Sequence, residues 1–335
     1  MNEPAAPATS GEGARKTRRP YLWREPQVPS LADLFAGGER RDRFLAYWRK
    51  DGPLDLMDEL LFPVFRSLPL RFSSWLGGRI ARFLARRKYA KAFQRVCGNL
   101  AMIRPDLDDA AREALALSHF DNAGRVLAEF PLLSRLGPAG RLLHESGGLL
   151  PRLHAEGPVI LLGVHTANWE IMAPIFTSLG APVTLDYKPP RRAGQLRIAV
   201  RVRQSLGLKL LPPGMAGARP ALRLLQAGEC LCIYGDEEHD GRIQAPFFGR
   251  PPHLNGNLAI AARLARMTGA KILAFHGERR PGGRYAFVFE GPVVLPSQAD
   301  PAAPLLDDVI ALNAVIEPVV RAHCGSWWFL DGRFD

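Results

Sequence analysis

The sequence predicts an α/β protein with a mixed sheet flanked by helices, preceded by a helical N-terminal region. Up to about residue 155 the apolar residues follow helical spacing. A short continuous apolar run, PVILLGV at 158–164, then reads as a strand buried on both faces. Strand-like and helix-like segments alternate from there to the C-terminus, which is the pattern of helices packed on a shared sheet.

The composition is that of a globular protein. Of the 335 residues, 47% are hydrophobic and 23% are charged, so burial of apolar surface is sufficient to fold the chain. Four scattered cysteines do not make a disulfide framework, and the first 20 residues lack the apolar core of a signal peptide. We therefore expect a reducing environment on the cytoplasmic side of a membrane. Residues 1–30 are interpreted as a disordered basic tail with little to bury.

Residues 31–155 are predicted to be helical. A helix-length run covers 107–129, and breaks are expected at Pro53, Pro63, Pro69, Pro105, Pro131 and Pro138. Within this region, residues 54–95 interleave Leu, Phe, Ile and Trp with eight basic residues: Arg71, Arg79, Arg82, Arg86, Arg87, Lys88, Lys91 and Arg95. This pattern is typical of an amphipathic membrane-contacting segment, and equally of a core helix with a solvated basic face.

The α/β core is predicted to span residues 156–335. Further strands are expected near 183–186, 208–211, 230–234, 271–275 and 285–290. Helices are expected near 168–179, 195–206, 217–227, 256–268 and 305–322. No repeat divides these segments, so we take them as one unit.

The charge balance predicts an anionic partner. Lys and Arg number 44 against 33 Asp and Glu, which gives a net charge of +11. The basic residues are spread among Leu and Phe and match no nucleic-acid-binding motif, so nucleic acid is not expected as a partner. An anionic lipid surface or an acidic substrate fits better. No apolar stretch reaches the length of a membrane-spanning helix.

The segment GVHTANWE at 163–170 is the most informative for chemistry. It follows the first strand, so His165 is expected at the carboxyl edge of the sheet, where α/β sites form. Glu170, in the first turn of the next helix, is expected to fold back and hold one ring nitrogen of His165. The other nitrogen would then remove a proton from a hydroxyl. The alternative is a capping or packing histidine.

GVHTANWE also resembles the Gly-His-x-x-Asn-Trp-Glu form of the His-x4-Asp/Glu motif of glycerolipid acyltransferases. That form occurs in the late acyltransferases of lipid A biosynthesis and in related phosphatidylinositol mannoside acyltransferases. The resemblance runs from about residue 54 to the C-terminus, in the order Asn99-Leu100 with Arg104-Pro105-Asp106, Phe120 to Glu129, Tyr187-Lys188-Pro189, Gly228 through Asp236, and Pro246-Phe247-Phe248-Gly249. The chain departs from the family at Lys188, at Asp236-Glu237, and at the C-terminal WWFLDGRFD, which lacks an expected His-Arg pair.

The resemblance implies transfer of a fatty acyl chain from acyl carrier protein or coenzyme A to a hydroxyl of a lipid A precursor, an anionic glycolipid. His165 would be the general base and Glu170 its orienter. Substrate-binding or oxyanion candidates are Asn168, Lys188, Arg191, Arg192, Asp236, Phe247 and Phe248. The implied location is the cytoplasmic face of the inner membrane, with the protein peripheral or monotopic. No cofactor is expected beyond the acyl thioester.

Competing functions are weighed on the same residues. No Gly-x-Ser-x-Gly elbow exists for a serine hydrolase, and no glycine fingerprint follows the first strand for a nucleotide-binding enzyme. The acidic run Glu237, Glu238, His239 and Asp240 invites a metal interpretation, but four adjacent loop residues do not close easily around one ion, so no metal is expected. A phosphatidylinositol mannoside acceptor and a membrane-surface scaffold with a vestigial site remain as alternatives.

Overall fold

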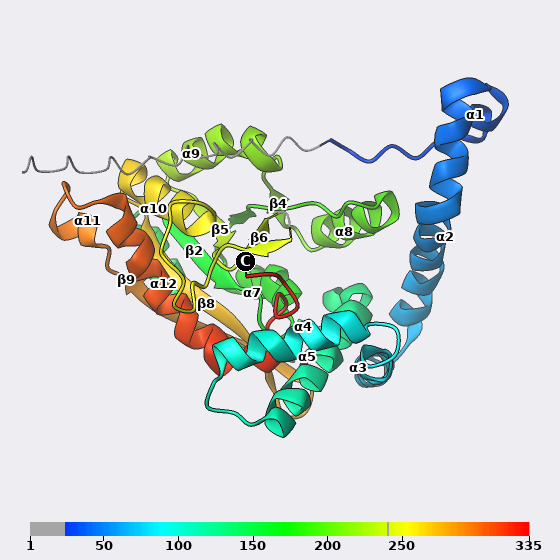
Figure 1. The fold of residues 1–335 in the computed structure, drawn as a ribbon. Coiled ribbons are helices and arrows are strands. Elements are labelled where there is room, and N and C mark those ends of the chain that lie inside the picture. Colours follow the sequence, from blue (N-terminus) through cyan, green and yellow to red (C-terminus); the bar gives the residue numbers. More distant parts are fainter. Residues whose placement is uncertain (1–23, 138, 240, 335) are drawn as a thin grey trace, which may run out of the picture.

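A seven-stranded sheet forms the centre of the protein. The computed structural model describes residues 24–137, 139–239 and 241–334, so most of the expected tail and the break at Pro138 lie outside the described residues. The strand order across the sheet is β1 (Leu142–Glu145), β9 (Arg284–Val293), β8 (Lys271–Arg280), β2 (Val159–Val164), β5 (Cys230–Tyr234), β3 (Val183–Leu185) and β4 (Lys209–Leu210) (Figure 1). A separate hairpin joins β6 (Glu238–His239) and β7 (Arg242–Ile243).

The sheet is mixed, as the sequence predicts. Strand β2 lies parallel to β5 on one side and to β8 on the other, whereas β8 and β9 are antiparallel. In the β2–β5 pair Gly163 faces Tyr234. Two residues further along each strand, this register brings His165 beside Asp236 at the carboxyl edge of the sheet.

Side chains alternate between two cores on the two faces of the sheet. Ile160, Leu162 and Val164 face one core, while Val159 and Leu161 face the other. The first core is closed by α9 (Ala218–Gln226), α10 (Asn257–Thr268) and α12 (Leu305–Ala322), and the second by α6 (Leu149–Glu156), α7 (Met172–Ser178) and α8 (Ala193–Ser205). Two short elements precede helices of the first core: η3 (Gly214–Gly217) lies between β4 and α9, and α11 (Pro296–Ala299) lies between β9 and α12. The continuous apolar strands are therefore buried on both sides.

The helical N-terminal region packs on one end of this sandwich. It comprises α1 (Leu31–Phe35), α2 (Gly38–Ser67), α3 (Leu70–Ala85), α4 (Ala90–Ile103) and α5 (Asp109–Glu129), followed by the turn η1 (Phe130–Arg135). Helices α4 and α5 contribute Phe93, Leu100 and Phe120 to the first core. Figure 1 shows α1 and much of α2 extending away from the body.

The expected helix breaks at Pro53 and Pro63 are wrong, because α2 continues through both residues. A proline inside a helix removes one main-chain hydrogen bond. The part of α2 between the two prolines is stabilised by ion pairs with residues outside the helix. Arg192, the residue before α8, pairs with Asp55 and Asp58 of α2, and Arg197 of α8 pairs with Glu59. The helix ends at Ser67, before Pro69, and α4 ends before Pro105, as predicted.

Strand β1 is a second difference from the sequence prediction, which gave a helical region with proline breaks and no strand over 31–155. Leu142–Glu145 pairs in parallel with β9 at the edge of the sheet. Its residues are mostly exposed, and two of the four are polar, so the segment lacks the apolar run that marks the central strands.

Large apolar side chains are exposed on α2 and α3. On α2, beyond Trp48, they are Leu54, Leu56, Met57, Leu60, Leu61 and Val64, and on α3 they are Phe72, Trp75, Ile80 and Phe83. We call this set the α2–α3 apolar surface. Within the part of the chain that the structure describes, no helix is long and apolar enough to cross a membrane.

Helices α3 and α5 cross at glycines. A Cβ atom on Gly124 would fall on the carbonyl oxygen of Gly77 and the side chain of Ala81, closer than Cβ atoms approach such groups. Ser73 also donates from Oγ to the carbonyl of Ala128 at 2.8 Å. The close contact of backbones thus fixes α3 against the body.

We expect Gly124→Ala to lower the free energy of unfolding by about 1–3 kcal/mol, because the added methyl group forces the two helices apart. Gly98→Ala on α4 is the matched control: a Cβ there meets nothing within 4 Å, so helix propensity alone makes it neutral or stabilising by up to about 1 kcal/mol. Urea unfolding of the two variants checks this. Equal stabilities would contradict the packing argument.

Candidate active site

His165 and Asp236 lie side by side at the ends of β2 and β5. The Nδ1 atom of His165 is 2.8 Å from Oδ1 of Asp236. The backbone N–H of His165 donates to the other carboxylate oxygen, Oδ2, at 2.7 Å. Two neighbouring parallel strands thus supply both partners, as the register between Gly163 and Tyr234 requires.

A third hydrogen bond fixes the Asp236 carboxylate. The indole Nε1 of Trp327 donates to Oδ2 at 2.7 Å, and Asp236 and Trp327 are both fully buried. A buried carboxylate requires such donors to replace the water it has lost. Asp236 therefore has a single orientation, with Oδ1 directed at the imidazole.

This arrangement sets the tautomer of His165. An ionised carboxylate only accepts hydrogen bonds, so Nδ1 carries the proton and donates to Asp236. Nε2 then keeps its lone pair and is able to accept a proton. The side chain of His165 is 14% exposed, so the ring lies at the surface of the site rather than inside the core.

Aromatic rings hold the imidazole in place. Tyr234 stacks on it with ring centroids 3.9 Å apart, while Trp169 and Phe329 meet it edge-on at 4.8 and 5.0 Å. Burial raises the pKa of Tyr234 well above its ordinary value, so its phenol stays neutral. The ring of His165 is thus restrained on several sides as well as at Nδ1.

Glu170 does not orient His165, and this corrects the sequence-based assignment. Its carboxylate forms a two-pronged ion pair with Arg203 of α8, at 2.5 and 3.2 Å. Both side chains are buried. Burial is the largest single effect and lowers the pKa of Arg203, but the charge and hydrogen bond of Glu170, with Tyr187 and Tyr234, together outweigh it, so the net shift is upward.

The backbone after β2 explains the difference. The expected helix at 168–179 begins instead with the turn η2 (Trp169–Ile171), preceded by Ala167 in the left-handed region at φ +50°. Trp169 fills the space beside His165, and its ring also lies under the guanidinium of Arg203, 5.9 Å from the ring centroid. Glu170 is therefore directed toward α8.

A second buried ion pair supports the same loop. Asn168 donates to Glu129 of α5 at 2.7 Å, and Glu129 pairs with Arg279 of β8 at 2.7 and 3.0 Å. Asn122 donates to the carbonyls of Ala167 and Ser326, both at 3.0 Å. Asn168, a predicted substrate-binding residue, thus anchors the turn that carries His165.

The C-terminal segment forms another wall of the site. Thr166 and Trp327 form an isolated bridge, and the N–H of Trp328 donates to the carbonyl of His165 at 2.8 Å. Asn99 of α4 donates to the carbonyls of Leu330 and Gly332 at 2.7 and 2.9 Å. The Asn99-Leu100 stretch of the resemblance therefore serves to hold the chain end against the site.

Phe247 and Phe248 are buried in the first core. Their backbone N–H groups donate to Asn313 and Glu317 of α12, both at 2.9 Å. The ring of Phe248 meets Trp327 with centroids 5.9 Å apart. Packing beneath Trp327 is thus the observed role of this loop, and a role in an acyl groove stays a prediction.

The three predicted cations lie in different surroundings. Lys188 donates to the backbone carbonyl of Glu238 at 2.8 Å, Arg191 is exposed, and Arg192 is occupied by Asp55 and Asp58. The pairing of Arg192 favours a structural role for it. For Lys188 and Arg191 the oxyanion role stays a prediction. Glu238, from the acidic run, also accepts from the N–H of Gly241.

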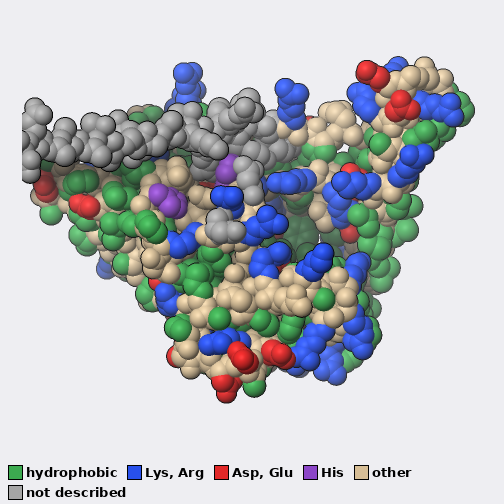
Figure 2. All heavy atoms as spheres, viewed as in Figure 1, with side chains coloured by type: hydrophobic (Ala, Val, Ile, Leu, Met, Phe, Trp, Pro, Cys, Tyr) green, Lys and Arg blue, Asp and Glu red, His purple; other side chains and the backbone are tan. Residues whose placement is uncertain are grey.

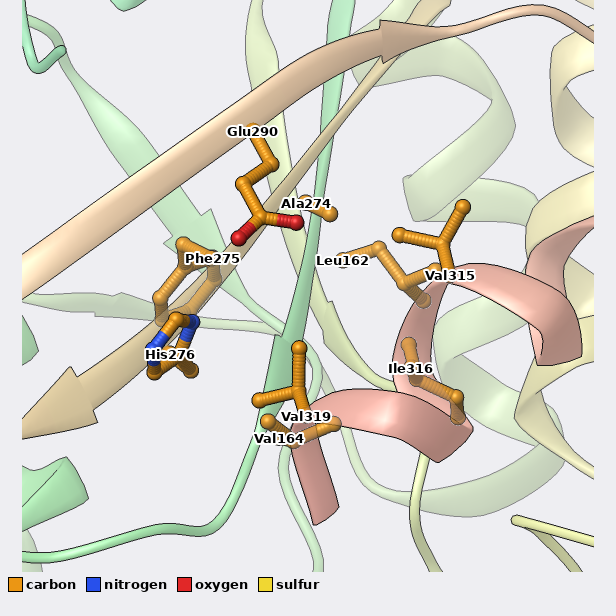
Figure 3. A pocket seen from close by; sticks show the side chains of 9 residues that line it. All are labelled: Leu162, Val164, Ala274, Phe275, His276, Glu290, Val315, Ile316 and Val319. Atoms are coloured by element: carbon orange, nitrogen blue, oxygen red, sulfur yellow. The ribbon is translucent and has the colours of Figure 1, made fainter. Parts of the chain in front are cut away.

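The cavity beside α12 is too small for a substrate, whereas the surface has larger hollows. An interior cavity between α12 and strands β2, β8 and β9 measures about 10 Å³, room for one water and too little for an acyl chain (Figure 3). Figure 2 shows Lys and Arg side chains around a hollow near α4 and α8, with hydrophobic side chains on its floor. A cleft of about 480 Å³ on α3 and α5 is lined by Arg79, Arg82, Phe83, Arg86 and Leu117.

Several contributors to the site have no signal of their own in the sequence. Arg203 and Arg279 are far from His165 along the chain and belong to no motif singled out above. Glu129 and Trp327 lie in stretches named for the resemblance, but nothing there gives either residue a role at His165. The position of Asp236 directly after a buried strand is the one signal that pairs it with His165, once β2 and β5 are known to be neighbours.

Comparison with known proteins gives a family match over most of the chain. The family model for bacterial lipid A biosynthesis acyltransferases matches residues 60–335. No curated protein matches the sequence. Among solved structures, the 1-acyl-sn-glycerophosphate acyltransferase PlsC from Thermotoga maritima is similar with 13% identity and a TM-score of 0.32, over 72% of this chain and 95% of that one.

We expect Glu170→Gln to lower the free energy of unfolding by about 3–5 kcal/mol, because it leaves the buried charge of Arg203 without its partner. The double variant Glu170→Gln with Arg203→Met should recover part of this loss. Urea unfolding measures both. A stable Glu170→Gln protein would contradict the structural role given to Glu170 here.

Proposed function

Because the chain belongs to the bacterial lipid A biosynthesis acyltransferase family, we propose that it transfers a fatty acyl chain from an acyl thioester to a hydroxyl of a lipid A precursor. The family establishes an acyltransferase acting on lipid, and the donor, acceptor and residue roles are the proposal. The observation that carries it is the hydrogen bond between His165 Nδ1 and the buried Asp236 carboxylate, which leaves Nε2 as a base.

The reaction begins with proton removal from the acceptor. Nε2 of His165 takes the proton of a lipid hydroxyl as its oxygen attacks the thioester carbonyl. The tetrahedral intermediate then expels the thiolate by breaking the C–S bond, and the thiolate takes the proton from Nε2. The products are an acyl ester and a free thiol, and the imidazole returns neutral.

Asp236 gives the imidazole its direction and balances its charge. While Nε2 holds the proton, the ring is positive and lies against the carboxylate at 2.8 Å. Trp327 and the His165 backbone keep that carboxylate fixed, so little reorganisation is needed. Lys188 and Arg191 are the proposed cations for the oxyanion or for substrate phosphates.

Charge and surface favour an anionic glycolipid acceptor at a membrane. The cleft lined by Arg79, Arg82 and Arg86 is open to solvent and offers guanidinium donors suited to phosphate. It borders the α2–α3 apolar surface, since Phe83 belongs to both. Apolar side chains would enter the lipid while arginines meet the headgroups. We place the protein, peripheral or monotopic, at the cytoplasmic face of the inner membrane.

The activity assay offers labelled acyl-acyl carrier protein or labelled acyl-coenzyme A together with Kdo2-lipid IVA or a phosphatidylinositol mannoside. We expect product on Kdo2-lipid IVA. Product on the mannoside alone would keep the mechanism and change the acceptor. Transfer to neither would favour a membrane-surface scaffold.

We expect His165→Ala and Asp236→Asn to lower the transfer rate by a factor of about 10²–10⁴, because the base or its orienting carboxylate is lost. Asp307→Asn, at an exposed carboxylate in the first turn of α12, is the matched control and should retain activity. Circular dichroism checks that each variant is folded. Full activity of Asp236→Asn would remove the dyad from the mechanism.

We expect the double variant Leu60→Glu with Phe83→Glu to bind phosphatidylglycerol vesicles at least about tenfold more weakly, since two exposed apolar side chains would no longer enter the bilayer. Added salt should weaken wild-type binding. Val294→Glu is the matched control, because Val294 is 73% exposed and lies outside the α2–α3 apolar surface. Vesicle co-sedimentation measures all three, and equal binding would refute the membrane assignment.

A further inference from the structure

Two histidines and a glutamate converge on the face of β8 that packs against α12, and none of them takes part in the proposed mechanism. His276 and Glu278 are two residues apart on β8 and therefore point to the same side of the strand. His323 caps the C-terminal end of α12. Each residue offers one possible ligand atom, a ring nitrogen or a carboxylate oxygen, and these three atoms all lie within 4.8 Å of one another.

The separations within this cluster match a metal site better than a hydrogen-bonded one. Oε1 of Glu278 is 3.3 Å from Nε2 of His276 and 3.5 Å from Nε2 of His323. Hydrogen bonds of this type are usually about 2.9–3.0 Å long. Ligands placed tetrahedrally about 2.0–2.2 Å from a zinc ion are about 3.3–3.5 Å from each other.

The surroundings supply what a metal ligand set needs. Arg280 binds the second oxygen of Glu278 at 2.8 Å and is itself paired with Glu145, so Oε1 is left to face the two imidazoles. Hydrogen bonding of a ligating carboxylate is the usual second layer of such sites. His276 is buried, whereas the side chain of His323 is 32% exposed and gives an ion access from solvent.

We propose that His276, Glu278 and His323 bind one divalent ion of the zinc class, with a solvent molecule in the fourth position. The set of two histidines and one glutamate is a known zinc combination. Hydrogen bonds connect this cluster to the loop that carries His165, so a bound ion would stabilise that part of the fold. The carbonyl of His323 accepts from the N–H of Ser326 at 2.9 Å, and the carbonyl of Ser326 accepts from Ala167 at 3.1 Å. The ion would thus tie α12 to β8 beside the loop that carries His165.

The test uses the full chain, freed of any purification tag and stripped with a chelator. Zn²⁺ is titrated in competition with a chromophoric chelator, and Co²⁺ is added separately to record its visible absorption. We expect about one Zn²⁺ per chain, a four-coordinate Co²⁺ spectrum, and a higher melting temperature with zinc than without.

Variants locate the ion. His323→Ala and Glu278→Gln should each weaken zinc binding more than about tenfold and abolish the Co²⁺ spectrum. His323→Gln, which preserves size and polarity, is the second choice should His323→Ala fail to fold. His144→Ala is the control, because His144 is exposed on β1, and it should bind as the wild type does.

Absence of zinc binding by the wild type would overturn the proposal, as would binding that survives in folded His323 and Glu278 variants. Zinc binding lost equally in His144→Ala would point to adventitious surface ions and also overturn it. The proposed transfer reaction is tested by other residues, so either result leaves that proposal standing.

Discussion

The buried carboxylate of Asp236 is the contact on which the site depends. It accepts from the backbone N–H and the Nδ1–H of His165 and from the indole of Trp327. Strand β5, strand β2 and the C-terminal segment are thereby joined at one fully buried group. A buried carboxylate that lacks hydrogen-bond donors is costly. Loss of any of these three hydrogen bonds would leave the same carboxylate under-satisfied, so the stability of the fold and the orientation of the imidazole are coupled.

Two further buried ion pairs explain why His165 is presented so rigidly. Glu170 with Arg203 fixes the turn η2 to α8, and Glu129 with Arg279 fixes Asn168 between α5 and β8. Burial is the largest single effect and lowers the pKa of Arg279, but the charge and hydrogen bond of Glu129, with Tyr285, together outweigh it, so the net shift is upward. The glutamate of the His-x4-Glu motif thus pairs with α8 and stabilises the loop, while the carboxylate hydrogen-bonded to His165 comes from the neighbouring strand.

The central strands and most helices of the core were predictable, because apolar runs such as PVILLGV and CLCIY indicate strands buried on both faces. Strand β1 was not, since an exposed edge strand containing His144 and Glu145 lacks that pattern. The position of His165 at the sheet edge also followed from its place after β2. The partner of His165 did not, because five residues of spacing leave open which way Glu170 turns, and Asp236 lies 71 residues away along the chain. Pairing of β2 with β5 is the missing information.

The central claim is that Asp236 holds the proton of His165 on Nδ1. Nitrogen-15 NMR of histidine side chains tests it most directly, with the His165 signals assigned by their absence in His165→Gln. The account predicts a protonated Nδ1 and an unprotonated Nε2 in the neutral ring, unchanged in folded Glu170→Gln and altered in Asp236→Ala. A proton on Nε2 in the wild type, or a tautomer that changes with Glu170 and not with Asp236, would contradict it.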